Sequence, residues 1–188
     1  MKLLSWNVRG MGKPRTRLAI KKILHLHRPD IFFCCETKMM AKQVSLECRH
    51  FNFENHFAVD RNGLGGGLAL FWSSDVEVEI KSYSSHHIDA VVKNENGKVW
   101  RCTGVYGHPE TNQKHHTWTL LKRLVGIFSY HWCCFGNFNE ILNLQEKLGG
   151  NEKNIEMVIK FREAVQACNL VDMGYKGYPF TWSNRRYG

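Results

Sequence analysis

The sequence predicts a layered α/β or α+β domain, and three observations support this. Short apolar runs of strand length alternate with segments in which apolar residues recur every three or four positions, as in a helix. Of the 188 residues 43% are hydrophobic and only four are proline, so a chain of this length can bury a sizeable core. No repeat or linker composition divides the sequence, and we therefore expect one domain over 1–188. This composition excludes a disordered or collagen-like chain.

The N-terminal pattern predicts a strand, a helix and a second strand. Leu3 to Val8 is expected to form the first strand, which a turn-rich loop ends. Apolar residues then recur at helical spacing from Thr16 to His27, with Thr16 as the candidate N-cap and Pro29 as the stop. The continuous apolar run over 31–35 is typical of a strand buried on both faces.

Strands dominate the middle of the chain, and helices return after it. The predicted strands are Phe51–Val59, Gly67–Trp72, Val76–Tyr83, Ile88–Val92 and Lys98–Tyr106. The three glycines over 65–67 open a strand rather than a helix, which favours a tight turn or a close backbone approach over a phosphate-binding loop. We expect helices over Trp118–Phe128 and about Ile155–Cys168, with a short buried strand over His131–Phe135 between them.

Charge and cysteine usage indicate an intracellular protein with a polyanionic partner. The formal net charge is +9, and residues 1–50 alone carry 11 basic and three acidic side chains. A basic block of this kind is typical of nucleic-acid binding and also of inert basic surfaces. The seven cysteines contain no Cys-x-x-Cys pair, which favours buried free thiols in a reducing compartment. No signal peptide or membrane-spanning run is found, so we expect a nuclear or cytoplasmic protein that is not secreted.

Polar side chains recur directly after the predicted buried strands. They are Asn7, Glu36, Tyr106, Asn137 and Asn139. Strand ends are places where a rigid sheet can hold side chains from distant sequence positions together, although each residue alone is also an ordinary turn former. One carboxylate among them makes a metal or acid–base site a candidate.

Five motifs in register resemble the endonuclease/exonuclease/phosphatase superfamily. They are LSWNVRG over 4–10, ETK over 36–38, GVYGHP over 104–109, GNFNE over 136–140 and FTW over 180–182. The version is most similar to the abasic-site-type endonuclease domain of plant non-LTR retrotransposons. The resemblance implies an α+β fold, a four-layered α/β/β/α sandwich with two mostly antiparallel sheets. It also implies a magnesium-dependent phosphodiester hydrolase that nicks DNA.

The resemblance assigns a role to each residue that follows a strand. Glu36 would be the principal ligand of Mg²⁺, or of Mn²⁺, and Asn7 would orient the metal or the phosphate, because hard cations prefer oxygen ligands. Tyr106 would hydrogen-bond the scissile phosphate, and Asn139 would hold a phosphate or the attacking water. Asn137 occupies the position of the group that orients or deprotonates this water.

The expected partner is DNA, with no membrane and no small-molecule cofactor, and the oligomeric state stays open. Basic side chains after Asn7 are candidates for contacts to the phosphate backbone, namely Arg9, Lys13, Arg15 and Arg17. A solvated basic surface is the alternative for these four. Thr181 and Trp182 match a motif near the substrate face, where the indole could stack against DNA or belong to the core.

Two departures from the family pattern predict weak or absent catalysis. Asn137 stands where the family has aspartate, and an amide cannot take up a proton. The family's Ser-Asp-His motif is not found, since the sequence contains no Asp-His pair and no histidine after His131. We therefore expect a domain that is incomplete at its C-terminus and lacks its last strands. His86, His87, His115 and His116 are expected at exposed positions, and His108 in a loop.

Two other functions remain open at this point. One is a non-catalytic, basic nucleic-acid-binding remnant of a retroelement. The other is a phosphatase on the same fold that acts on a phosphoinositide or another small phosphoester, since one fold can host all three chemistries.

Overall fold

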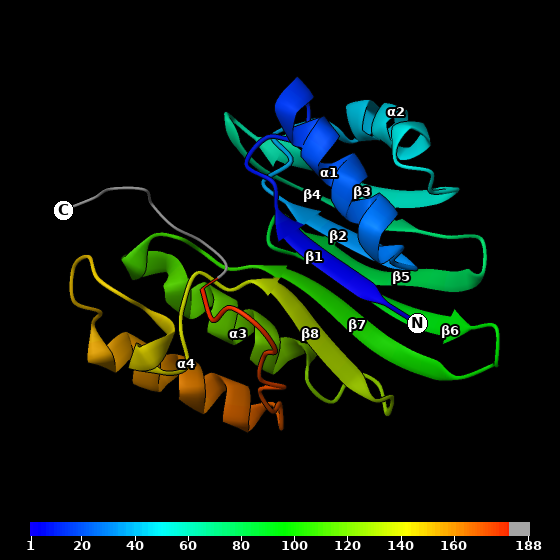
Figure 1. Cartoon of the computed structure of the whole chain (residues 1–188). Helices are drawn as coiled ribbons and strands as arrows, with labels where there is room; N and C mark the ends of the chain where they lie inside the picture. Colours follow the sequence, from blue (N-terminus) through cyan, green and yellow to red (C-terminus); the bar gives the residue numbers. More distant parts are fainter. Residues whose placement is uncertain (181–188) are drawn as a thin grey trace. The chain divides into compact units, whose positions relative to one another are not determined.

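The computed structural model describes residues 1–180 and contains two compact units. The first unit comprises Met1–Gly107 and Phe128–Asn137, and the second comprises, among the described residues, His108–Ile127 and 138–180. The eight strands of the described residues all belong to the first unit, where they form two four-stranded sheets (Figure 1).

The first sheet has the strand order β1-β2-β4-β3. Its strands are β1 (Leu3–Asn7), β2 (Ile31–Cys35), β4 (Gly65–Trp72) and β3 (Asn55–Asn62). β1 and β2 run parallel, whereas β4 is antiparallel to both of its neighbours. Parallel neighbours need a crossover connection, which helix α1 (Pro14–His27) supplies.

The second sheet has the strand order β5-β6-β7-β8. Its strands are β5 (Val76–Ser84), β6 (His87–Asn94), β7 (Val99–Tyr106) and β8 (Trp132–Asn137). The first three are antiparallel, and β8 is parallel to β7. Each sheet thus has one parallel pair, and the strands of such a pair end on the same side of their sheet.

Apolar side chains from both sheets form one core. Those from the first sheet include Ile31, Phe33, Cys35, Leu68 and Leu70, and those from the second include Ile88, Ala90, Val92 and Cys102. A Cβ atom at Gly104 would lie 2.5 Å from the Phe33 ring, so only glycine lets this ring approach β7 so closely. The same ring meets Phe135 edge to face at a centroid distance of 5.7 Å.

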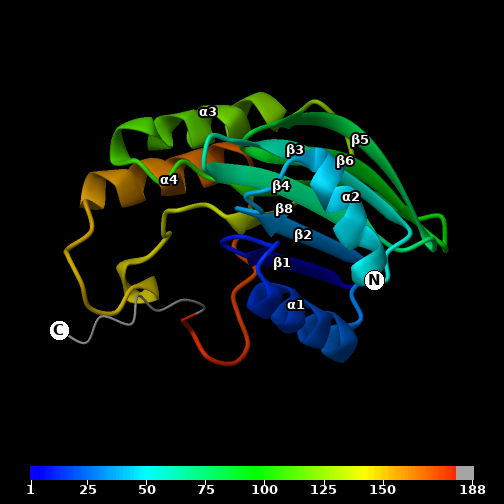
Figure 2. The same ribbon diagram turned by 90° about the horizontal axis from the view of Figure 1, so that it is seen from above.

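Helices α1 and α2 (Ala41–His50) pack on the other face of the first sheet. Ile20 and Leu24 of α1 and Val44 and Cys48 of α2 join Phe32 of β2 in a second apolar cluster. Helix α2 contacts β3 and β4, over which it lies in Figure 2. The first unit is therefore a helical layer on two stacked sheets.

The second unit contains helices α3 (Lys114–Leu124) and α4 (Ile155–Ala167), which contact each other. The Asn154 side chain caps α4 by accepting a hydrogen bond from the backbone N–H of Glu156 at 2.9 Å. Phe161 of α4 meets Phe138 at a centroid distance of 5.6 Å. No helix in residues 1–180 is long and apolar enough to cross a membrane.

Sheet β5-β6-β7-β8 also holds a buried ion pair. Arg101 donates to both carboxylate oxygens of Asp89, from Nε at 2.9 Å and from Nη2 at 3.0 Å, and Thr103 donates to Asp89 at 2.6 Å. The guanidinium lies 5.2 Å from the Phe128 ring centroid and 4.7 Å from that of Trp132. Both charged side chains are only 1% exposed, so each depends on the other for compensation of its buried charge.

Some local predictions are wrong, and each error has a physical cause. Helix α1 begins at Pro14 with Lys13 as its N-cap, so Thr16 lies inside the helix and is not the cap. Helix α2 was not predicted because its apolar positions are sparse, although Gln43 supports its start by accepting the backbone N–H of Met40 at 2.9 Å.

Other predicted boundaries shift as well, and β3 and α3 are examples. Strand β3 begins at Asn55 rather than Phe51, because Phe51 and Phe53 enter the apolar cluster beneath α2. Helix α3 begins at Lys114 rather than Trp118 and ends at Leu124. The close backbone approach predicted for the glycines over 65–67 is confirmed at Gly67, where a Cβ atom would lie 2.3 Å from Thr37 Oγ1.

Candidate active site

The ends of the two parallel strand pairs bring the predicted site residues of the first unit together. Asn7 is the last residue of β1, in register with Cys35 at the end of β2, and Glu36 follows directly. Tyr106 and Asn137 end β7 and β8 and are paired with each other. The strand ends that carry Asn7, Glu36, Tyr106 and Asn137 therefore lie together in the first unit.

Glu36 is the centre of this cluster. Its Oε1 accepts a hydrogen bond from Asn7 Nδ2 at 2.9 Å and one from the Tyr106 hydroxyl at 3.0 Å. The second bond links the two sheets, because Tyr106 belongs to β7 and Glu36 follows β2. Glu36 Oε2 accepts no hydrogen bond within residues 1–180, so the two neighbours orient one carboxylate oxygen and leave the other available to a ligand.

The backbone holds Glu36 in a left-handed conformation, with φ of 54°. Its carbonyl oxygen accepts the N–H of Gly10 at 2.8 Å, and the next carbonyl, of Thr37, accepts the N–H of Met11 at 2.9 Å. A non-glycine residue with this φ is uncommon and persists where the surroundings impose it. The loop after β1 therefore fixes the Glu36 loop from one side.

The start of β4 fixes the same loop from the other side. The N–H groups of Thr37 and Lys38 donate to the carbonyl oxygens of Gly67 at 3.1 Å and of Gly66 at 2.9 Å. The Thr37 side chain is fully buried and occupies the space that a Cβ at Gly67 would need. Glycine at position 67 is thus a requirement of the site and not only of the turn.

Asn137 lies beside this cluster because β8 pairs with β7. Gly107 donates its N–H to the Asn137 carbonyl at 2.8 Å, which continues the ladder past Tyr106. The preceding residue must be glycine, since a Cβ at Gly136 would lie 2.1 Å from the Val105 carbonyl oxygen.

The Cys35 thiol next to Glu36 stays protonated. Burial, and then the negative charge of Glu36, raise the pKa of Cys35 to about 12, while a hydrogen bond with the Asn137 backbone acts in the opposite direction. A thiolate ligand or nucleophile at Cys35 is therefore disfavoured at neutral pH.

The carboxylate of Glu36 fits as the single protein carboxylate ligand of a hydrated magnesium ion. Magnesium keeps several waters and is commonly bound by one or two carboxylates together with substrate phosphates. Within residues 1–180, no group of three or more His, Cys, Asp or Glu side chains is placed to hold a metal ion. The residues present thus suit such a weakly held, water-rich ion and not a closed protein cage.

Asn139 belongs to the second unit, where charged neighbours hold its backbone. Lys114 Nζ donates to the Asn139 carbonyl at 2.9 Å and to Glu140 at 2.5 Å, and Lys153 donates to Glu140 at 2.7 Å. Burial alone would raise the pKa of Glu140, but the hydrogen bonds from the two lysines outweigh it and lower the pKa below its ordinary value. These contacts fix the loop that carries Asn139, whose φ is 55°.

The predicted phosphate contacts fall into two groups. Arg9, Lys13 and Arg15 are exposed, as a contact to a polyanion requires. Arg17, in contrast, forms an ion pair with the buried carboxylate of Glu47 in α2. Thr181 and Trp182 lie outside the described residues.

The predictions for the histidines are partly wrong. His115 and His116 are exposed as predicted, and His108 lies in a loop where its Nδ1 is 3.1 Å from the Thr117 hydroxyl. His87, in contrast, is only 5% exposed, and its ring nitrogens lie 3.1 Å from Ser82 Oγ and 2.8 Å from Ser84 Oγ. Burial is the main cause that lowers the pKa of His87.

The prediction of an exposed position is also wrong for His86. This residue is half-buried, precedes β6, and stacks on the ring of Tyr106. The pairing of β6 with β7, which places position 87 opposite Val105, is the signal that locates His86 beside Tyr106, and it is visible only in the sheet register.

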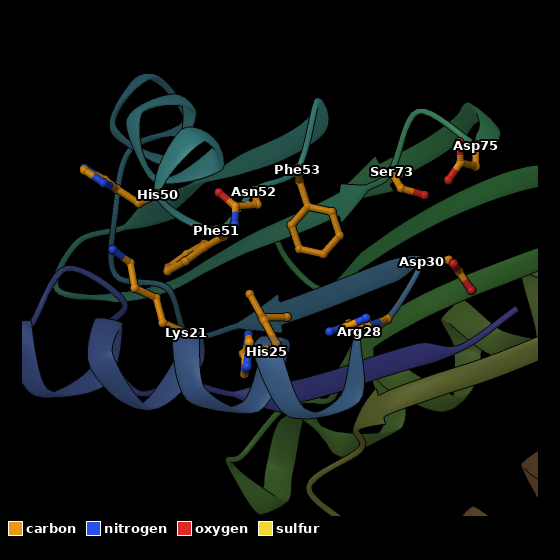
Figure 3. Close-up of a pocket in the computed structure, with 12 residues that line it drawn as sticks. Lys21, His25, Arg28, Asp30, His50, Phe51, Asn52, Phe53, Ser73 and Asp75 are labelled. Carbon is orange, nitrogen blue, oxygen red and sulfur yellow. The ribbon is translucent and has the colours of Figure 1, made fainter.

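A cavity of about 590 Å³ in the first unit is distinct from this cluster (Figure 3). Phe51 and Phe53 line it between the ends of α1 and α2. It is also lined by Asp30, which precedes β2, and by Ser73, which follows β4. The cavity thus lies at the start of β2, whereas Glu36 lies at its end.

Comparison with known proteins identifies the family. The profile described as the endonuclease/exonuclease/phosphatase family matches residues 4–187. The chain belongs to this family. The family and the fold class predicted from the motifs are thereby confirmed, since the two mostly antiparallel sheets with helices match the fold of solved relatives. A search of curated proteins by sequence finds no match.

Three solved structures show the family fold. The endonuclease domain of TRAS1, a telomere-specific non-LTR retrotransposon, is 12% identical to this chain. The TM-score is 0.66, and the match covers 89% of this chain and 71% of that one. The AP endonuclease LMAP from Leishmania major is 13% identical with a TM-score of 0.64 over 89% of this chain and 66% of its own. The 3′ phosphatase NExo from Neisseria, bound to a product DNA hairpin, is 17% identical with a TM-score of 0.59 over 90% and 70%.

Sequence identities this low show that the fold is shared, but they do not show that the substrate is shared. The chain spans 66% of the length of the Leishmania enzyme, so the activity, substrate and partners of the whole family enzymes are proposals for it.

Proposed function

We propose that the chain is a divalent-metal-dependent phosphodiester hydrolase domain of retroelement origin that binds DNA and turns over slowly. The observation that carries this proposal is the Glu36 carboxylate, which Asn7 and Tyr106 orient at the converging strand ends. Family membership supports the reaction class, and the DNA-processing relatives support a nucleic-acid partner. An intracellular location, nuclear or cytoplasmic, belongs to the same proposal because such a substrate is found there.

In this proposal Glu36 holds Mg²⁺, or Mn²⁺, and Asn7 keeps the carboxylate in place. When bound, the ion neutralises charge that develops on phosphate oxygens. The Tyr106 hydroxyl has one proton, which it donates to Glu36, so a donor bond to a substrate phosphate would be an alternative to this contact. Arg9, Lys13 and Arg15 attract the phosphate backbone.

Slow turnover follows from the chemistry of Asn137. Its amide has nearly the shape of the family's aspartate, but it carries no negative charge and cannot accept a proton from water. Loss of a general base typically lowers the rate by about 10²–10⁴-fold. Asn139 retains an amide that can hold a phosphate or a water.

The test combines metal binding with DNA cleavage. Supercoiled plasmid and an abasic-site duplex are incubated with the protein and Mg²⁺, and Mn²⁺ affinity is measured by electron paramagnetic resonance. We expect Mn²⁺ binding that Glu36→Ala abolishes and Glu95→Ala leaves intact, because Glu95 is an exposed residue of the turn between β6 and β7 and does not belong to the Glu36 cluster. Rapid nicking that depends on Glu36 would contradict slow turnover, and absence of Mn²⁺ binding would contradict the metal site.

Asn137→Asp tests the cause of slow turnover. The new carboxylate should increase nicking, but by less than the 10²–10⁴-fold that a general base typically supplies, because the sequence contains no Asp-His pair. A rate in the range of active family enzymes would show that Asn137 alone limits the reaction.

A second candidate function, non-catalytic nucleic-acid binding, is favoured by the same Asn137. Its signature is DNA affinity that falls steeply with salt, as expected from counterion release, without any Glu36-dependent cleavage. A small-phosphoester phosphatase would instead hydrolyse inositol phosphates in preference to DNA, which the same assay format measures.

A further inference from the structure

His86 and Tyr106 are joined by three contacts at the edge of the candidate active site. The Tyr106 N–H donates to the His86 carbonyl at 2.8 Å, and His86 Nδ1 lies 2.8 Å from the Tyr106 carbonyl oxygen. The two rings are parallel within 3°, with centroids 5.9 Å apart, which is an offset stack. Backbone and side chain of His86 thus both fix Tyr106.

The contact to the carbonyl determines the tautomer of His86. A carbonyl oxygen can only accept a hydrogen bond, so Nδ1 must carry a proton and donate it. This donor is present in the neutral and in the protonated imidazole, so the contact does not depend on the charge of His86. The histidine is further held by its own N–H, which donates to Ser84 Oγ at 3.1 Å.

The Tyr106 ring needs such support because its hydroxyl reaches across to the other sheet. Tyr106 is only 8% exposed, and its hydroxyl donates to Glu36 Oε1 at 3.0 Å. The position of the hydroxyl follows from the position of the ring, and the His86 imidazole covers one face of this ring. A change at His86 is therefore transmitted to Glu36 through Tyr106.

We propose that His86 is a positioning residue of this site, which holds the Tyr106 phenol where it orients Glu36. The proposal rests on the proposed function for its effect on metal binding, but its structural core, the control of Tyr106, is independent of any metal. In this assignment His86 acts on Glu36 through Tyr106. Partners of metal ligands are known to tune metal affinity in this way.

The experiment observes Tyr106 directly. The full chain is labelled with 3-fluorotyrosine, and the ¹⁹F resonance of Tyr106 is assigned by its loss in Tyr106→Phe. We expect His86→Ala to shift and broaden this resonance and to weaken Mn²⁺ binding by about three- to tenfold, the range that corresponds to one neutral hydrogen bond. His86→Asn retains an N–H donor and should recover most of the affinity, whereas His86→Phe retains only the stacked ring.

Two controls separate positioning from general structural damage. Ser85→Ala changes an exposed residue of the same turn and should leave the resonance and the affinity unchanged. In a Tyr106→Phe background, His86→Ala should have no further effect on Mn²⁺ affinity, because its influence passes through the phenol. An equal loss in both backgrounds would overturn the proposal.

The remaining outcomes distinguish this proposal from the proposed function. An unchanged Tyr106 resonance in both His86→Ala and His86→Phe overturns the positioning role, whatever the metal does. If wild-type protein shows no Mn²⁺ broadening of the Tyr106 resonance, the metal site fails, while the shift caused by His86→Phe still decides the role of His86. If His86→Ala does not fold, the comparison of His86→Asn with His86→Phe decides the same question.

Discussion

Gly67→Ala is the substitution that most directly tests how the fold positions Glu36. The added Cβ would lie 2.3 Å from Thr37 Oγ1 and 3.3 Å from the Lys38 nitrogen, and Gly67 has a φ of +84°. Thr37 is fully buried, so it cannot move aside without displacing its neighbour Glu36. Both the overlap and the backbone strain therefore act on the loop that carries the carboxylate.

The magnitude follows from these two contributions. A left-handed conformation costs an L-residue about 1–2 kcal/mol, and overpacking a buried site costs about 1–3 kcal/mol. We expect Gly67→Ala to lower the free energy of unfolding by about 2–5 kcal/mol, as measured by urea denaturation, and to weaken Mn²⁺ binding at Glu36. Thr37→Ala in the same background should recover the part of the loss that the overlap causes.

Gly65→Ala is the matched control for this measurement. A Cβ at Gly65 has no atom within 4 Å, so this variant should fold at least as stably as the wild type and bind Mn²⁺ equally. If Gly67→Ala matched Gly65→Ala in both stability and affinity, the backbone clamp on Glu36 would be refuted.

Two further predictions concern buried charges. Glu140 has a lowered pKa in the folded state, so its contribution to stability is present above the ordinary value of 4.5 and is lost as the pH falls through the folded-state pKa. Urea midpoints measured between about pH 3 and 7 should show a smaller acid-induced loss in Glu140→Gln than in the wild type. Arg101→Met leaves Asp89 buried without its cation and should destabilise the fold by about 3–5 kcal/mol, whereas replacing both partners by apolar residues should restore much of this loss in the same urea assay.

Local sequence pattern predicted those elements whose burial shows in the residues themselves. Strand β2 is fully buried over Ile31–Cys35, and its continuous apolar run is recognisable without any tertiary information. Helix α2 was not predicted because only Ala41, Val44, Leu46 and Cys48 are apolar in its ten residues, and Leu46 is 67% exposed. Its stability depends on packing over β3 and β4, which no local pattern encodes.

The same distinction applies to the charged and titratable residues. Arg17 belongs to a basic run, yet the buried carboxylate that binds it lies 30 positions later in the chain. His86 and His87 are neighbours in sequence, but their environments differ: His86 stacks on Tyr106, whereas His87 is buried between two serines. Side chains alternate between faces along a strand, so only the register of β6 with β7 separates the two histidines.

The residues alone were sufficient to predict the family, the two-sheet fold class and the polar residues at the strand ends. Motif order and apolar runs of strand length are properties of the chain itself. The geometry of the site required the tertiary structure. Asn7 and Tyr106 lie 29 and 70 positions from Glu36, and they meet the same carboxylate oxygen only because two parallel strand pairs end together. Contacts across such sequence distances depend on sheet order and register, which periodicity does not determine.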